Sequence, residues 1–486
     1  MLFNSLSFLV FFPLVFFLYW ALPGKMRPVL LLLASCYFYM AFVPYYILIL
    51  FFLITVDYFL AFGLERGGAY KKVYLYVSIL SNVGMLFVFK YFNFFNDNIA
   101  ALAQVLHWNY SLGALSLILP LGLSFHIFQS LAYIIEVYKG RYKAERNYLT
   151  YALYVMFFPQ LVAGPIERPA QLIPQLKAIQ QFNYTQVISG LRLMAWGFFK
   201  KIVIANNLAI LVNFVYARSG TADASMLLIA VFAFSIQLYA DFSGYSDIAV
   251  GSARMFGVEL VQNFKQPYFS RSVAEFWRRW HISLSSWFRD YVYLPLAWKY
   301  STHLGWLYAA IIVTFVLTGV WHGAGWNYVL MGLIFGLYIS IGLWTKERRD
   351  SFAHKIGLLG ASRAFLQIGT TFILATFAWI FFRAANLSEA LTIIYRLGTQ
   401  WGSDAFHFLR CSDYCSFYML GIGRKALVLI FISTVFLFFV EYIEQSGWLP
   451  KIWKYRAVRW TGYYALLMWM LLVGYFAPTA FIYFQF

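Results

Sequence analysis

WLYAAIIVTFVLTGVWHGAGWNYVLMGLIFGLYISIGLW, residues 306–344, is the stretch that decides the fold. It contains no Lys, Arg, Asp or Glu, and His322 with its neighbouring glycines interrupts it near the middle. About 20 apolar residues are enough for a helix to cross the hydrocarbon core of a bilayer. The stretch therefore predicts membrane helices on either side of a turn that carries a histidine.

The rest of the chain has a similar composition. Hydrophobic residues make up 62% of the 486 residues and charged residues 12%, whereas about a quarter of a soluble domain is charged. Aromatic residues reach 22%; Phe suits a lipid-facing helix, and Tyr and Trp suit the membrane interfaces. We therefore expect residues 1–486 to form a single membrane domain.

Apolar stretches recur along the sequence and predict an all-α, polytopic membrane protein with about 11–13 membrane helices. Those near 148–163 and 306–321 are short enough to be re-entrant or tilted. The stretches lie near residues 2–21, 28–43, 45–64, 73–92, 113–137, 148–163, 190–216, 226–250, 306–321, 327–345, 364–383, 426–443 and 461–481.

Basic residues outnumber acidic ones, and the net charge is +18. They are concentrated in short segments between the apolar stretches, as the positive-inside tendency predicts for cytoplasmic loops. Such segments can attract anionic lipid headgroups or a phosphorylated cofactor. We expect membrane lipid as a partner and no nucleic acid, because no polar, basic domain exists to hold a nucleic acid.

Ionisable residues within apolar segments are functional candidates, because charge at membrane depth is costly. Asp241 and Asp247 lie at the end of an apolar run. They either contact substrate or form a structural pair with a basic residue such as Lys200 or Lys201. His322 is the strongest single candidate, because the flanking glycines let other groups approach it. The alternative for His322 is a hydrogen-bonded packing residue.

Residues 265–300 interleave basic and aromatic side chains, a pattern typical of amphipathic helices that lie in the membrane interface. Arg278, Arg279 and Arg289 either anchor this surface or hold the phosphates of an anionic cofactor, a task for which Arg is well suited. His281 lies at the apolar edge of the cluster.

Two other segments have simpler interpretations. Three prolines and a glycine in residues 158–169 prevent a regular helix and predict a tight interhelical loop or a segment lining protein or water. His407, Cys411 and Cys415 have four-residue spacing, but no further ligands are evident. We expect free thiols or a local disulfide there, and no metal site in the chain.

In these segments the chain resembles the membrane-bound O-acyltransferase (MBOAT) family, and most closely its bacterial branch of alginate O-acetyltransferase-like proteins. The likeness covers essentially the full length. Its motifs are MLFNS at 1–5, LPLGLSF at 119–125, FQS at 128–130, QLVAGPIER at 160–168, DFSGYSD at 241–247, FWRRWH at 276–281, WHG at 321–323, AWIFFR at 378–383 and FIYFQF at 481–486.

The resemblance implies a ring of helices around a funnel through the membrane, with His322 as the catalytic histidine and His281 as a second polar position. It implies that acetyl-CoA reaches the funnel from the cytoplasm as a substrate, with no permanently bound cofactor. It further implies that a polysaccharide receives the acetyl group through periplasmic partner proteins, at the bacterial inner membrane. Residues expected to bind substrate or donor are Arg278, Arg279, Arg289, Trp321, Asp241, Ser243, Tyr245 and Asn327.

This chemistry suits the residues, because a positioned imidazole can take the proton of a sugar hydroxyl as that hydroxyl attacks a thioester. Within the family, peptidoglycan O-acetylation and D-alanyl transfer to teichoic acids are alternatives. A non-catalytic glycan transporter is the alternative outside it. Transporters often contain paired halves, and the Trp-His-Gly and Arg-Arg-Trp-His segments occur once each, which favours the enzyme.

Overall fold

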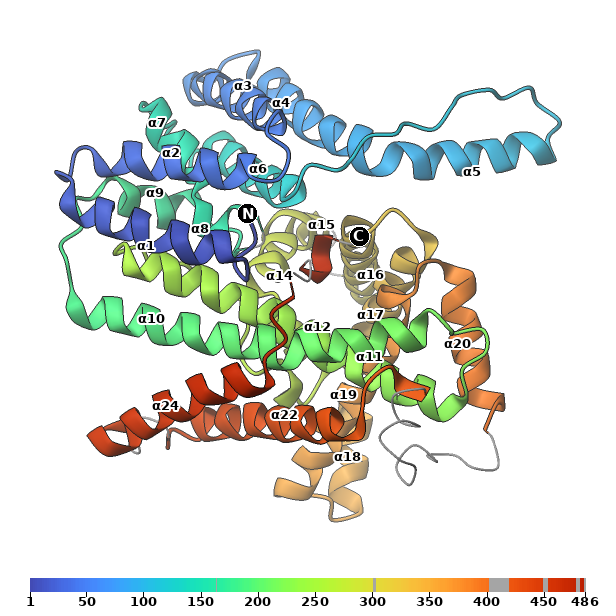
Figure 1. Cartoon of the computed structure of the whole chain (residues 1–486). Coiled ribbons are helices and arrows are strands. Elements are labelled where there is room, and N and C mark those ends of the chain that lie inside the picture. The colour runs from blue at the N-terminus through green and yellow to red at the C-terminus, as the bar shows by residue number, and fades with distance from the viewer. Residues whose placement is uncertain (163, 300–302, 402–418, 449–452, 478–480, 485–486) are drawn as a thin grey trace. The chain divides into compact units, whose positions relative to one another are not determined.

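The computed structural model describes residues 1–162, 164–299, 303–401, 419–448, 453–477 and 481–484 (Figure 1). Every regular element in these ranges is helical, which confirms the all-α prediction. The chain forms two compact units. Among the described residues, unit 1 comprises those in 1–194 and 246–262, and unit 2 comprises those in 195–245 and 263–484.

Two long helices, α10 (Tyr184–Phe198) and α12 (Ala224–Met255), contribute to both units. The other helices of unit 1 are α1 Leu6–Ala21, α2 Arg27–Met40, α3 Tyr46–Arg66, α4 Lys71–Leu86, η1 Phe87–Tyr91, α5 Phe92–Val105, α6 Leu123–Tyr138, α7 Tyr148–Met156, α8 Phe158–Leu161 and α9 Pro169–Lys177. Those of unit 2 are η2 Phe199–Ala205, α11 Asn206–Tyr216, η3 Pro267–Phe269, α13 Val273–Arg279, α14 Ile282–Phe288, η4 Arg289–Tyr293, α15 Leu294–Lys299, α16 Leu304–His322, α17 Trp326–Trp344, α18 Lys346–Lys355, α19 Gly360–Arg383, α20 Leu387–Thr399, α22 Arg424–Gln445, α24 Arg456–Val473 and η6 Ile482–Phe484.

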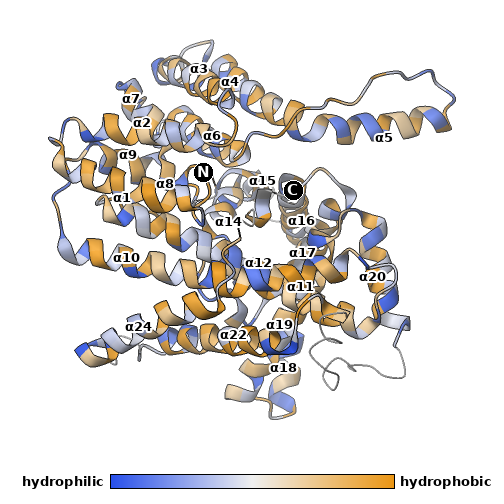
Figure 2. Cartoon of the chain, in the orientation of Figure 1, coloured by the Kyte–Doolittle hydropathy of each residue, from blue (hydrophilic) through white to orange (hydrophobic). Residues whose placement is uncertain are grey.

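Eight helical segments in the described ranges are long and apolar enough to cross a membrane, and α1 and α2 are shorter apolar helices. Hydrophobic residues predominate along the long helices (Figure 2), as expected for helices in contact with lipid or protein. The stretch near 306–321 forms α16, which is long enough to span. The stretch near 148–163 is divided between α7 and α8, and each is too short to span.

The segment expected to lie in the interface forms the short helices α13, α14 and α15 with their connecting turns. Ser272 begins α13, because its hydroxyl accepts a hydrogen bond from the Glu275 backbone N–H at 3.2 Å. The aromatic residues of α13 and α14 are buried in unit 2, whereas Trp298 on α15 is 77% exposed. The Trp280 ring is fully buried and lies 5.2 Å from the Trp379 ring on α19. The exposed positions of the segment include both the charged residue Arg278 and the aromatic residue Trp298.

Glycines allow α16 and α17 to approach closely. A Cβ atom on Gly332 would lie 2.3 Å from the Phe315 carbonyl oxygen, and one on Gly336 would lie 2.9 Å from the Ile312 Cα atom. These contacts show that Gly332 and Gly336 pack α17 closely against α16, an arrangement typical of small residues four positions apart. Because His322 is the last residue of α16, this packing also fixes its position.

We predict that Gly332→Leu lowers the free energy of unfolding of the purified protein by about 3 kcal/mol, because the added side chain must push backbone atoms apart. Gly342→Leu, on the same helix, is the control, because nothing lies within 4 Å of its Cβ position. Thermal unfolding in detergent measures both variants. Equal melting temperatures would contradict the close packing.

Candidate functional site

His322 and His281 lie in one aromatic enclosure of unit 2. The His322 ring centroid lies 4.9 Å from that of Trp321 and 5.6 Å from that of Tyr483. The same two rings lie 6.1 and 6.3 Å from the His281 ring. The exposed fractions are 3% for His322 and 0% for His281. The structure therefore brings the two predicted catalytic histidines together around Trp321.

His281 occupies the junction between α13 and α14. Its φ is +44°, a left-handed conformation that is uncommon outside glycine. Its Nδ1 atom lies 3.1 Å from Oδ1 of Asn263, which also accepts hydrogen bonds from Ser283. Burial lowers the pKa of His281 to about 3, so the imidazole is neutral at physiological pH.

Asp241 on α12 forms an ion pair with Lys201 on η2, with 2.6 Å between Oδ1 and Nζ. Both side chains are buried. The other oxygen, Oδ2, accepts a hydrogen bond of 2.9 Å from the Ile482 backbone N–H. Of the two interpretations of this carboxylate, the structure supports the structural pair.

Ser243 and Tyr245 lie in the same part of α12. Ser243 is fully buried, and its hydroxyl has no hydrogen-bond partner among the described residues. The Tyr245 ring stacks on Phe481 at 4.5 Å. Tyr245 therefore adjoins the segment that carries Tyr483. Neither the sequence pattern nor the residue types indicated Tyr483, although it lies within the FIYFQF motif.

Asn327, another predicted binding residue, has a structural contact. Its side-chain amide donates hydrogen bonds to the carbonyl oxygens of Phe381 and Ala384, at 3.1 and 2.9 Å. It thereby satisfies acceptors at the C-terminal end of α19, which would otherwise lack partners. This contact ties the start of α17 to α19 beside His322.

The three predicted phosphate-binding arginines lie outside the buried enclosure. Arg278 is exposed, and the Arg289 side chain is 61% exposed. Arg289 pairs with Asp290 at 2.8 Å, and Arg279 pairs with Glu275 at 2.6 Å. The arginine side chains are therefore more exposed than the two histidines.

The described residues contain no group of three or more His, Cys, Asp or Glu side chains that could hold a metal ion. His407, Cys411 and Cys415, for which we expect no metal site, lie outside the described residues.

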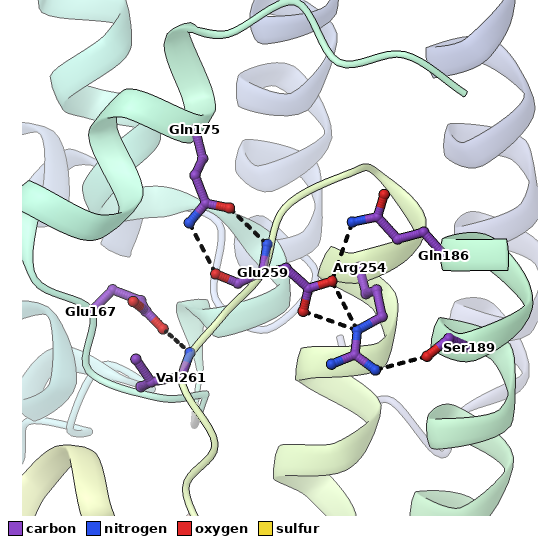
Figure 3. A network of polar contacts seen from close by, with 7 residues as sticks. All are labelled: Glu167, Gln175, Gln186, Ser189, Arg254, Glu259 and Val261. Atoms are coloured by element: carbon purple, nitrogen blue, oxygen red, sulfur yellow. Dashed lines mark hydrogen bonds and ion pairs between the residues drawn. The ribbon is translucent and has the colours of Figure 1, made fainter. Parts of the chain in front are cut away.

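The proline-rich segment 158–169 belongs to unit 1 and forms part of a polar network (Figure 3). The Glu167 carboxylate accepts a hydrogen bond of 2.7 Å from the Val261 backbone N–H. Burial raises the pKa of Glu167 to about 7. Gln175 bonds both the N–H and the carbonyl of Glu259, whose side chain pairs with Arg254. The network supports the interpretation of this segment as an anchored interhelical loop.

Comparison with known proteins identifies similar chains. The model of the MBOAT, membrane-bound O-acyltransferase family matches residues 145–382. A peptidoglycan O-acetyltransferase of Helicobacter pylori is 34% identical, over 81% of this chain and 79% of that protein. A probable alginate O-acetylase of Pseudomonas putida is 33% identical, over 93% and 90%. A teichoic acid D-alanyltransferase of Bacillus subtilis is 29% identical, over 55% and 69%.

We predict that Lys201→Met or Asp241→Leu alone lowers stability by about 3–5 kcal/mol, because each leaves a buried charge without its counter-ion. The double variant should recover much of that loss. Arg289→Gln, which breaks an exposed pair, should change stability little. Thermal unfolding in detergent provides the comparison. Additive losses in the double variant would show that the two side chains are energetically independent.

Proposed function

Because the chain belongs to the MBOAT family and is a membrane acyltransferase, we propose that it transfers acetyl from cytoplasmic acetyl-CoA to a polysaccharide exported to the cell envelope. In this proposal the protein lies in the bacterial inner membrane, and the acetyl group reaches the polysaccharide through periplasmic partner proteins. The observation that carries the proposal is the buried enclosure shared by His281 and His322. The names of two similar proteins, a peptidoglycan O-acetyltransferase and a probable alginate O-acetylase, support acetyl as the transferred group.

His322 serves as the general base in this proposal. A hydroxyl group is a weak nucleophile at neutral pH, and the imidazole takes its proton as the oxygen attacks the thioester carbonyl carbon. The new C–O bond forms, the C–S bond breaks, and the thiolate of coenzyme A leaves and takes up a proton. His281, Trp321 Nε1–H and backbone N–H groups beside Gly323 are the candidate donors of hydrogen bonds to the tetrahedral oxyanion.

Three arginines would hold the donor on the cytoplasmic side in this proposal. The guanidinium groups of Arg278, Arg279 and Arg289 match phosphate geometry, and a donor there would extend its pantetheine arm inwards. Since Arg279 and Arg289 pair with carboxylates, the donor phosphates would compete with Glu275 and Asp290 for them.

An alginate-like exopolysaccharide is our first proposal for the acceptor, and peptidoglycan is the second. The second is favoured by a peptidoglycan O-acetyltransferase that is similar to this chain over most of its length. D-alanyl transfer is less favoured, because the D-alanyltransferases match about half of the chain. Mass analysis of envelope glycans from cells with and without this protein distinguishes the acceptors by which glycan loses acetyl groups.

We predict that His322→Ala reduces acetyl transfer at least about 100-fold, as expected for loss of a general base. His281→Ala should slow transfer while membrane insertion is retained. Labelled acetyl-CoA with purified protein and an acceptor glycan provides the assay, and the exposed residue His354 provides a control variant, His354→Ala. Full activity of folded His322→Ala would remove this residue from the mechanism.

We predict that Arg278→Glu with Arg279→Glu raises KM for acetyl-CoA more than KM for the acceptor, because the reversed charges repel the donor phosphates. Lys346→Glu, an exposed charge reversal on α18, is the control. Initial rates at varied concentrations of each substrate separate the two constants. An unchanged KM for the donor would refute the phosphate-binding role.

A further inference from the structure

Asn263 contacts the beginning of α14 through both its backbone and its side chain. Its carbonyl oxygen accepts a hydrogen bond of 2.9 Å from the Ile282 N–H, and its Oδ1 accepts one of 3.2 Å from the Ser283 N–H. The first N–H groups of a helix have no acceptor within the helix. Asn263 thus supplies acceptors for two of them and holds the junction where His281 lies.

These contacts determine which way the Asn263 amide faces. Oxygen and nitrogen of an amide side chain are told apart by their partners. A backbone N–H can only donate, so the Asn263 atom that faces the Ser283 N–H is the oxygen. The Ser283 hydroxyl approaches the same atom at 3.0 Å and can donate to it.

The amide orientation in turn determines the tautomer of His281. Its Nδ1 lies 3.1 Å from the same Asn263 oxygen, which can only accept. Nδ1 therefore carries the hydrogen. A neutral imidazole has one N–H, so Nε2 is an acceptor.

The surroundings of His281 keep the imidazole neutral. The side chain is fully buried among aromatic rings, whose centroids lie 4.6 Å away for Phe242, 6.4 Å for Phe264, 6.1 Å for Trp321 and 6.3 Å for Tyr483. Tyr483 is the titratable group among these rings, and burial raises its pKa. Burial likewise opposes a positive charge on His281.

We propose that Asn263 is a positioning residue that holds His281 as the Nδ1–H tautomer, so that Nε2 enters the acyl transfer as a hydrogen-bond acceptor. This proposal rests on the proposed function, and it restricts the role of His281 in acyl transfer to that of a hydrogen-bond acceptor at Nε2. A neutral His281 in this tautomer has no N–H to offer an oxyanion from Nε2. The oxyanion must then take its donors from Trp321 or the backbone.

The first experiment measures the tautomer without any substrate. Full-length protein carrying ring-¹⁵N histidine in lipid is compared with its His281→Gln variant, whose missing signals assign His281. We expect a protonated Nδ1 and an unprotonated Nε2 at neutral pH. In Asn263→Leu these two signals should shift or broaden, because the acceptor is gone. A protonated Nε2 in the unmodified protein would overturn the inference, whether or not the chain transfers acetyl groups.

The second experiment measures kinetics. Asn263→Leu should lower kcat at least about 10-fold and leave KM for acetyl-CoA unchanged. The loss of the residue that fixes the tautomer of a histidine in the site lowers the rate of the chemical step and does not weaken binding. Ser283→Ala is the matched control, since it removes another donor to the same oxygen and keeps the bond to His281. We expect near-normal kcat for this control.

Asn263→Asp separates positioning from mere structural support. The carboxylate still accepts from Nδ1–H and from the Ser283 N–H, so activity should exceed that of Asn263→Leu. The added negative charge raises the pKa of His281. As the pH falls, Asn263→Asp should therefore lose activity at a higher pH than the unmodified protein does, because the activity requires neutral His281. An unshifted acid limb, together with equal losses in Ser283→Ala and Asn263→Leu, would overturn the proposal.

Discussion

The buried ion pair between Lys201 and Asp241 is the interaction on which the site geometry depends. Removing two charges from water costs several kcal/mol per ion, and this cost is offset only where geometry is good and further hydrogen bonds are made. Here the carboxylate uses its second oxygen to accept from the Ile482 N–H. One pair of charges thereby joins η2, α12 and the segment that carries Tyr483.

Aromatic rings packed around Tyr483 then form the enclosure that holds the two histidines. Tyr483 lies 4.4 Å from Phe242, and through Phe242 it adjoins His281. The Tyr483 ring also lies 5.6 Å from the His322 ring. These buried rings lower the local dielectric, so the few polar groups among them, including the Trp321 N–H and the Tyr483 hydroxyl, have large effects on one another.

The parts of this arrangement that could be predicted are those with local causes. Apolar length predicted the helices, and the cost of an ionisable group at membrane depth singled out His322 and Asp241. Asn263 could not be found in this way, because its importance comes from contacts made 18 to 20 positions further along the chain. The three arginines could be predicted because their side chains suit phosphate binding. Their exposure could not, because it depends on tertiary packing, which places Arg278 and Arg289 at the surface.

The two histidines are not equivalent, because they differ in their place relative to the helix ends. His322 is the last residue of α16, where the negative end of the helix dipole stabilises a positive charge. His281 lies between the C-terminal end of α13 and the first residue of α14, so the dipoles of these two short helices oppose each other there. An imidazole that becomes charged when it takes a proton is therefore better placed at the end of α16. The helix directions favour His322 as the proposed base, whereas the role proposed for His281 depends on its contact with Asn263.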